Sequence, residues 1–210
     1  MMIPIASIVE GHGEEGAVPA LLERLASQLA PDLVNQLFFP RPIRVPRDRL
    51  VKPGELEKAV NLAGRKVRPN GAIFVLIDAD DSCPATLGPI LLRRAEAECG
   101  DLPIALVLAK KEYESWFLAA AASLRGFADL PIDLAPPQDP EEVRGAKQWL
   151  TNRMPRGRAY AETIDQEEFT RRFDIHEARS ADSFDKCCRE VERLLRDIGQ
   201  SNQTTDAEAH

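Results

Sequence analysis

Hydrophobic positions along the first part of the chain form short continuous runs separated by longer amphipathic stretches. The clearest run is AIFVLID at residues 72–78, which follows an Asn-Gly pair and ends in acids, and shorter runs occupy residues 2–9 and 103–109. Continuous apolar runs of this length predict strands buried on both faces. The segment QLFFPRPIRV at residues 36–45 is rich in β formers, but its two prolines cannot donate to a ladder, so it predicts an edge strand.

Apolar residues at helical spacing follow each of these runs. Helices are expected at residues 14–30, 54–67, 85–99 and 110–127. Strands that alternate with helices predict an α/β fold with a mostly parallel sheet of about four strands and helices on both faces. The chain is long enough for one main domain with a full hydrophobic core.

The alternation stops near residue 128, where a segment rich in proline and acid predicts a surface excursion. Helical stretches come after it. We therefore interpret residues 1–127 as an α/β core and residues 128–198 as a helical extension packed on that core. Residues 199–210 are polar and predict a disordered tail.

Composition narrows the class of protein. The net charge of −7 argues against a protein that coats nucleic acid by bulk electrostatics, although local patches can still bind phosphate. No apolar run is long enough to span a bilayer, and no secretory signal is visible. The cysteines lack the spacing of a zinc site or a disulfide framework. These features predict a cytoplasmic protein without a membrane partner.

Acidic side chains gather where the predicted strands end. Glu10 follows the first strand, Asp78 and Asp80 follow the strand at 72–78, and Glu112 and Glu114 follow the strand at 103–109. Ligands of open α/β sheets bind outside the carboxyl ends of the strands, so we expect these acids at one edge. Their mutual repulsion would be relieved by a divalent cation, and hard oxygen ligands suit Mg²⁺ or Mn²⁺. Strand alternation places Asp78 and Asp80 on one side, where they could share a metal.

The turn EGHGEEG joins the first strand to the first helix. We expect Gly11 and Gly13 to allow a left-handed backbone and the close approach of a ligand, with a phosphate held at the N-terminus of the helix. The turn matches neither a P-loop nor a Rossmann fingerprint. Glu14 lies in the first turn of that helix, where an acid is also favoured by the helix dipole alone.

Two basic segments could contact a phosphate backbone. They contain Arg44 and Arg47 in RPIRVPRDRLVK, and Arg156 and Arg158 in RMPRGR. Charged loops are usually only solvated, and acids at helix starts usually cap helices, so each of these groups has a purely structural alternative.

Several of these residues resemble a known family. VEGHGEE and, about 70 residues later, LIDADD resemble the two motifs of the Toprim domain, the catalytic fold of primases and type II topoisomerases. KEYESWFLA is similar to a bacterial family of unknown function in the Toprim-like group, related to the overcoming-lysogenization-defect nucleases. The resemblance implies that Glu10 is the general acid or base, that Asp78 and Asp80 hold Mg²⁺, and that Glu14 is a second acid of the turn.

From these features we predict a Mg²⁺-dependent nuclease that acts on DNA or RNA, and the resemblance makes a role in bacterial defence plausible. The roles of Glu112 and Glu114 as metal ligands rest on strand position alone. The main alternative is a non-enzymatic or regulatory Toprim-fold module that works with a partner ATPase. A phosphatase or nucleotidyl enzyme acting on a small molecule is a third and weaker interpretation.

Overall fold

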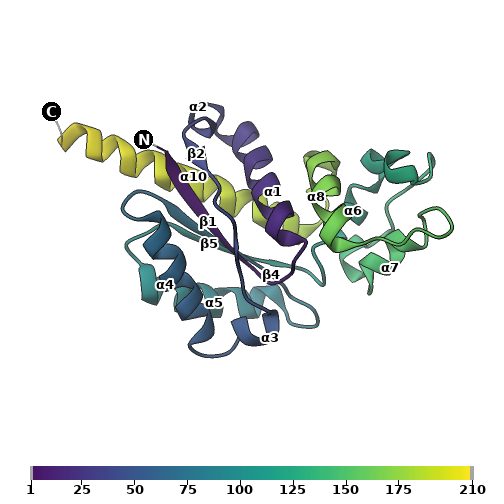
Figure 1. The fold of residues 1–210 in the computed structure, drawn as a ribbon, viewed down its shortest axis with the longest axis horizontal. Coiled ribbons are helices and arrows are strands. Elements are labelled where there is room, and N and C mark those ends of the chain that lie inside the picture. Colours follow the sequence, from purple (N-terminus) through teal and green to yellow (C-terminus); the bar gives the residue numbers. More distant parts are fainter. Residues whose placement is uncertain (1, 209–210) are drawn as a thin grey trace.

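The computed structural model describes residues 2–208, and their side chains as far as residue 200. Its centre is a five-stranded sheet in which all pairings between strands are parallel (Figure 1). The strands are β1 (Ile3–Val9), β2 (Leu37–Phe38), β3 (Ile43–Arg44), β4 (Ala72–Asp78) and β5 (Ile104–Ala109). The predicted α/β fold with a parallel sheet and flanking helices is confirmed.

Helices connect the strands and continue after the last one. Those between strands are α1 (Glu14–Leu29), α2 (Pro31–Val34), α3 (Arg47–Leu50), α4 (Glu55–Val67) and α5 (Pro84–Cys99). Those after β5 are α6 (Ser115–Ala119), α7 (Ala146–Thr151), α8 (Glu162–Arg172), α9 (Ile175–Ala178) and α10 (Asp182–Glu208), with 3₁₀ segments η1 (Ala121–Leu124), η2 (Phe127–Asp129) and η3 (Pro140–Glu142).

The strand order is β2-β1-β4-β5, and β3 also pairs with β1. Ile8 of β1 is opposite Ile43 of β3 and also opposite Val75 of β4, so β3 and β4 lie on opposite edges of β1. Pro40 and Pro42 fall between the two short strands β2 and β3. The edge position predicted for this segment is confirmed, and the prolines explain why it forms two short pieces.

Helices cover both faces of the sheet, as the continuous apolar runs predict. Every residue of β4 and β5 is buried. Phe74 and Leu76 belong to the core on the side of α1, α8 and α10, whereas Ile73, Val75 and Ile77 belong to the core on the side of α4 and α5. The alternation of side chains along a strand therefore divides the interior into two layers.

Residues on both sides of position 127 share one hydrophobic core. The cluster on the α1 side runs from Ile3 to Ile198 in α10. Trp116 contacts Phe184 with ring centroids 5.1 Å apart, and Phe117 contacts Phe169 at 5.5 Å. Aromatic pairs of this kind contribute about 0.5–1.5 kcal/mol beyond their buried area. The segment that we predicted as an extension thus completes one face of the sheet.

Two segments differ from the sequence-based prediction. The helix expected over residues 110–127 is reduced to the five residues of α6 and the turn η1, because Lys111 has a positive φ of 66° and helical geometry begins only at Ser115. The tail expected to be disordered from residue 199 continues as part of α10 through residue 208, and residues 209–210 lie outside the described residues.

Within residues 2–208, none of the helices combines the length and the apolar character that crossing a bilayer requires.

Candidate metal centre

The order of the strands reverses between β1 and β4. From β1 the chain passes through α1 to β2 and β3 on one side, and from β3 it passes through α4 to β4 on the other side. Open α/β sheets bind ligands in the crevice outside the carboxyl ends of strands at such a switch point. Glu10 directly follows β1 and Asp78 is the last residue of β4, so both lie beside this crevice.

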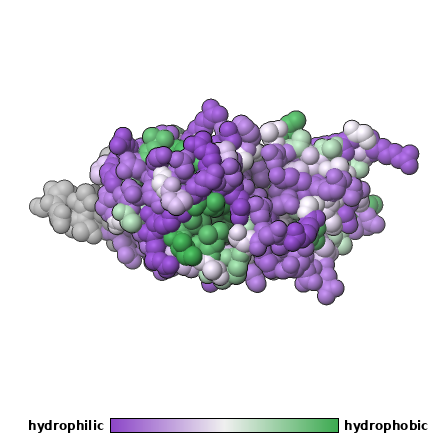
Figure 2. Space-filling view, turned by 90° about the horizontal axis from the view of Figure 1, so that it is seen from below, coloured by the Kyte–Doolittle hydropathy of each residue, from purple (hydrophilic) through white to green (hydrophobic). Residues whose placement is uncertain are grey.

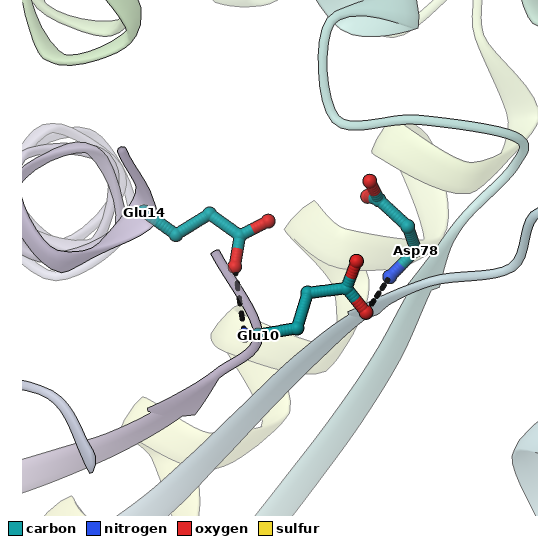
Figure 3. A group of neighbouring side chains, drawn as sticks. All are labelled: Glu10, Glu14 and Asp78. Atoms are coloured by element: carbon teal, nitrogen blue, oxygen red, sulfur yellow. Dashed lines mark hydrogen bonds between the residues drawn. The ribbon is translucent and has the colours of Figure 1, made fainter. Parts of the chain in front are cut away.

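Three carboxylates meet there. Glu10, Glu14 and Asp78 each place an oxygen within 4.8 Å of the other two, and Figure 3 shows their side chains converging from β1, α1 and β4. Asp78 is 7% exposed and Glu14 is 3% exposed, while Glu10 is half-buried. This burial separates the group from the solvated acids that are common on protein surfaces.

Hydrogen bonds hold the side chains of Glu10 and Asp78 in place. The backbone N–H of Asp78 donates to Glu10 Oε2 at 3.3 Å, and the N–H of Tyr113 donates to Asp78 Oδ1 at 2.8 Å. The other oxygens, Glu10 Oε1 and Asp78 Oδ2, have no hydrogen-bond partner among the described residues. Each carboxylate therefore keeps one oxygen for a ligand.

Glu14 fixes the turn that precedes it. Its Oε2 accepts hydrogen bonds from the backbone N–H groups of Glu10 at 2.9 Å and Gly11 at 3.0 Å. This arrangement resembles an N-terminal capping interaction, in which a side-chain carboxylate binds free backbone donors. We predicted a phosphate at this turn, but the backbone N–H of Gly11 is already bonded to Glu14. Glu14 Oε1 has no hydrogen-bond partner among the described residues.

Gly13 is needed in this turn for packing, and neither Gly11 nor Gly13 has an unusual backbone. Gly13 has a φ of −66°, and Gly11 is likewise absent from the positive-φ residues of the described chain, in contrast to the left-handed geometry that we expected. A Cβ on Gly13 would lie 2.2 Å from Gln166 Oε1 and 2.4 Å from the backbone oxygen of Glu162. The close approach predicted for a ligand is made by the start of α8.

Burial raises the pKa of all three carboxyl groups. Burial and the neighbouring Glu14 raise the pKa of Glu10 to about 8, although the Asp78 N–H opposes this shift. Burial also raises the pKa of Asp78 well above its usual range, with Glu14 and Glu10 adding to the shift, and burial raises the pKa of Glu14. The metal-free group therefore retains protons at neutral pH, whereas a divalent cation would favour its full ionisation.

Glu114 is a fourth buried carboxyl group near this site. It is fully buried; its Oε1 accepts from the Tyr160 hydroxyl at 3.1 Å and from Gln166 Nε2 at 3.3 Å, and its Oε2 has no partner among the described residues. Burial raises its pKa to about 7, and its negative charge contributes to the raised pKa of Asp78. Glu114 thus influences the three-carboxylate group from outside it, because its oxygens are not among those that converge.

Lys147 is a cation of the site that the sequence analysis missed. It lies on α7, pairs with Glu162 at 2.5 Å, and lowers the pKa values of Asp78 and Glu114 against the larger effect of their burial. Burial disfavours its own charged form, but Glu114 and Glu162 outweigh this and raise its pKa. The sequence does not indicate this role, because a lysine in AKQWLT looks like an ordinary solvated helix residue. Lys147 reaches the site because α7 packs against α6.

Asp80 lies beside the three carboxylates, not among them. Strand β4 ends at Asp78, and Asp80 has a φ of 49°, so the strand alternation that predicted a common face for these two acids does not reach it. Its carboxylate instead pairs with Arg47 at 3.2 Å. Arg47 also donates to the backbone oxygens of Asp78 at 2.7 Å and Ala79 at 2.9 Å, so it stabilises this loop.

Glu112 also lies outside the group. Its Oε1 accepts the backbone N–H of Gly145 at 3.1 Å. Together with Asp80 it borders a surface pocket of about 300 Å³ that also contains Lys111 and Arg144. Asp80 follows Asp78 by two residues, so this pocket opens close to the three carboxylates.

The other arginines predicted to bind phosphate occupy different surroundings. Arg44 lies 3.4 Å from Glu15, and Arg158 donates to Asp165 at 2.9 Å, which ties the loop before α8 to that helix. Arg156 is exposed. The structure therefore does not gather the two basic segments into one continuous track around the carboxylates.

The three converging carboxylates fit a hard divalent cation. All of their ligand atoms are oxygens, which Mg²⁺, Mn²⁺ and Ca²⁺ prefer, and the group contains neither cysteine nor histidine. The described residues could therefore hold a metal ion at the switch point. Three carboxylate oxygens by themselves do not select one of these cations over the others.

Comparisons with known proteins identify a family that has no assigned activity. No curated protein and no solved structure shows significant similarity to the chain. A family model, described as a domain of unknown function (DUF4276), matches residues 9–192, a range that begins just before Glu10 and includes every residue of the site. The chain belongs to this family, the DUF4276 domain proteins.

Proposed function

We propose that this protein is a Mg²⁺-dependent or Mn²⁺-dependent nuclease of Toprim type that cleaves phosphodiester bonds in DNA or RNA. The observation that carries the proposal is the group of three buried carboxylates at the switch point, each with an oxygen free for a ligand. Support also comes from the motifs VEGHGEE and LIDADD, because these Toprim-like stretches contribute Glu10, Glu14 and Asp78 to the group.

The three acids would have different roles. Asp78 and Glu14 are the more buried, and their free oxygens would hold the cation. When bound, the cation would polarise the scissile phosphate and lower the pKa of a water molecule. Glu10 is half-buried and its oxygens lie beside those of Glu14 and Asp78, so it is placed to carry a proton between the attacking water and the leaving oxygen.

The adjoining pocket would receive the phosphate. Lys111 and Arg144 lie 3.4 Å and 2.7 Å from Asp81, which is 71% exposed. A substrate phosphate could take the place of Asp81 in these ion pairs, because both are anions that bind ammonium and guanidinium groups. This gives a local positive contact for a phosphodiester in a chain whose net charge is negative.

The test is cleavage of supercoiled plasmid, single-stranded DNA and RNA in EDTA, Mg²⁺ or Mn²⁺, with metal binding measured in parallel by calorimetry. Asp78→Asn and Glu10→Gln are each expected to reduce cleavage by about 10²-fold or more. Glu15→Gln is the matched control, because it removes an acid from the same turn that is not in the group, and it should cleave at the wild-type rate. Wild-type cleavage by Asp78→Asn would contradict the mechanism.

A result of another kind would favour the alternative function. If the wild-type protein binds Mg²⁺ through these carboxylates but cleaves none of the substrates, the carboxylates would hold a structural or regulatory metal. The protein would then be a regulatory module that works with a partner ATPase, and cleavage would be assayed again with that partner present.

A further inference from the structure

The edge of the sheet formed by β5 is open. Within the part of the chain that the structure describes, β5 pairs with β4 alone. The carbonyl of Pro103 accepts a hydrogen bond from Ile73 in β4, and that of Ala109 accepts one from Ala79, directly after β4. Because backbone groups alternate in direction along a strand, Leu106 and Leu108 direct their N–H and C=O groups away from β4, toward the open edge.

Both ends of this edge are closed, but its middle is not. Arg193 donates to the Ile104 carbonyl at 2.6 Å, and the Lys110 N–H donates to Ser183 Oγ at 3.1 Å. Between these two contacts, no described residue bonds to the outward backbone groups of the two leucines. The open stretch is therefore a short ladder of donors and acceptors, of the kind that pairs with an added strand.

A groove of about 580 Å³ runs along this stretch, with the two leucines lining it. One wall comes from α5 and is apolar, with Ala85, Pro89 and Leu92. The opposite wall comes from α10 and is charged, with Lys186 and Glu190. Figure 2, which views the side of the molecule that carries α4 and α5, shows hydrophobic residues gathered in a patch within a mostly polar surface.

We propose that this groove binds an extended segment of a partner protein, which adds to β5 as a sixth strand. The unpaired backbone groups of Leu106 and Leu108 supply the main-chain hydrogen bonds of such β-augmentation. Side chains of an added strand point alternately to the two walls. The partner segment therefore alternates apolar residues, which pack on α5, with polar or charged residues, which face α10.

The walls favour this occupant over a second copy of the chain. All residues of β5 are buried, so β5 of another copy has no polar side to place against Lys186 and Glu190. A heterologous, amphipathic strand satisfies both walls and the backbone ladder.

The experiment selects binders for the full-length protein from a displayed library of peptides of about nine residues, in which Val or Leu alternates with Thr, Lys or Glu. The strongest binder is then synthesised in two N-methylated forms. Methyl groups on the N–H groups that face β5 are expected to raise the Kd by about tenfold or more, because they remove the pairing bonds. Methyl groups on the alternate N–H groups should leave it within about twofold.

Substitutions in the groove locate the binding. The double variant Ala85→Arg and Pro89→Arg places two long cations in the apolar wall at exposed positions of α5, and is expected to weaken binding by about tenfold or more. Ile90→Arg is the matched control, because Ile90 is exposed on the same helix but does not line the groove. All variants should keep the wild-type melting temperature.

Two outcomes would overturn the proposal. One is a library that yields no peptide whose binding depends on both the groove and the N–H groups facing β5. The other is a wild-type dimer in sedimentation that the double variant dissociates, since the groove would then be occupied by a second copy. Neither readout depends on metal binding or cleavage, so failure of the nuclease assay leaves this inference intact.

Discussion

The Asp78 carboxylate can offer an oxygen to a metal ion, but it destabilises the folded protein when no metal is bound. The side chain is 7% exposed and its carboxylate accepts one hydrogen bond, from the Tyr113 N–H, while Glu10 and Glu14 lie within 4.8 Å. A buried carboxylate without a cationic partner is unfavourable unless it is protonated or binds a metal. The shifted pKa of Asp78 has this origin, and it leads to a measurable prediction.

Replacing Asp78 with Asn should stabilise the metal-free protein at high pH. The amide oxygen can still accept the Tyr113 N–H, whereas the repulsion from Glu10 and Glu14 is lost. We expect the melting temperature in EDTA near pH 8 to rise by about 2–4 °C for each kcal/mol relieved. The increase should be smaller near pH 5, because the pKa of the Asp78 carboxyl is raised and acid favours its neutral form in the folded state. Calorimetric unfolding at both pH values measures it.

A control distinguishes relief of repulsion from a general effect of removing charge. Glu15→Gln removes an acid that pairs with Arg41 at 2.6 Å, and this arginine lowers the pKa of Glu15. This variant should lose stability slightly, by about 0–1 kcal/mol, because the pair is exposed to solvent. A fall in the melting temperature of Asp78→Asn near pH 8 would show that the Asp78 carboxylate is stabilising.

The stability of the metal-free protein should depend on pH through Glu10. Its pKa is about 8 in the folded state, against about 4.3 when unfolded, so the folded state binds more protons between these values. Stability from this group is complete below about pH 4 and is lost as the pH rises to about 8. Mg²⁺ competes with the protons, so its affinity should rise over the same interval and binding should release protons.

Unfolding experiments in EDTA and in Mg²⁺ across this pH range measure both effects, and Glu10→Gln should flatten both. The pair of Arg94 with Glu57 acts in the opposite sense, because it lowers the pKa of Glu57 to about 2 and stabilises the fold only above that value. Its contribution changes between about pH 2 and about pH 4.3, the pKa of an unfolded glutamate, whereas that of Glu10 changes above about pH 4.3, so the two pH intervals are separate. A melting temperature that is constant in EDTA from pH 5 to about 8 would contradict the shifted pKa of Glu10.

At the scale of elements, local sequence determines most of the sheet and its connecting helices. The continuous apolar run of β4 predicts a strand buried on both faces, and the two prolines between β2 and β3 predict a position at the sheet edge. The structure has both features. The convergence of Glu10 and Asp78 was predictable for the same reason, because neighbouring parallel strands end at one edge.

Tertiary contacts determine the elements that could not be predicted. The stretch from residue 110 has the apolar spacing and alanine content of a long helix, yet Lys111 adopts a left-handed backbone and all five residues of α6 are buried. Asp80 leaves the strand alternation for the same kind of reason, since Arg47 fixes its loop. Lys147 enters the site only because α7 packs next to α6.

The contact between the first turn of α1 and the start of α8 leads to a third prediction. Gly13→Ala would place a Cβ 2.4 Å from the backbone oxygen of Glu162, so α8 would have to move. We expect a loss of about 1–3 kcal/mol and weaker metal binding, because Glu14 follows directly in the chain. Gly199→Ala in α10 meets nothing within 4 Å and should be neutral or stabilising by up to about 1 kcal/mol. Equal melting temperatures for the two variants would contradict this contact.

At the scale of the whole molecule, the helices after residue 127 belong to the same folding unit as the sheet. Helix α8 packs on α1, and α10 packs on both β5 and α1, in one cluster of buried residues that reaches Ile198. The family model spans residues 9–192 and therefore crosses the same position without interruption. Removing these helices would uncover the side of β5 on which α10 packs and the side of α1 on which α8 and α10 pack.

A chain ending at residue 127 should therefore fail to fold by itself. It would expose Trp116 and Phe117, which are fully buried against residues of α8 and α10, and burial of each such side chain contributes about 1.5–3 kcal/mol or more. Together with the contacts that β5 and α1 would lose, this loss is comparable to the typical stability of a domain, about 5–15 kcal/mol. We expect an insoluble product, or one without a cooperative unfolding transition in circular dichroism.

A chain ending at residue 200 is the control. It keeps Ile198, the last residue of the α1-side core among the described side chains, and should unfold with the wild-type midpoint. Co-expression of residues 128–210 with the shortened chain should restore solubility if the two parts form one core. A soluble 1–127 fragment that unfolds cooperatively and binds Mg²⁺ would place a domain boundary at residue 127, and the helices would then act on the site from outside an independent α/β core.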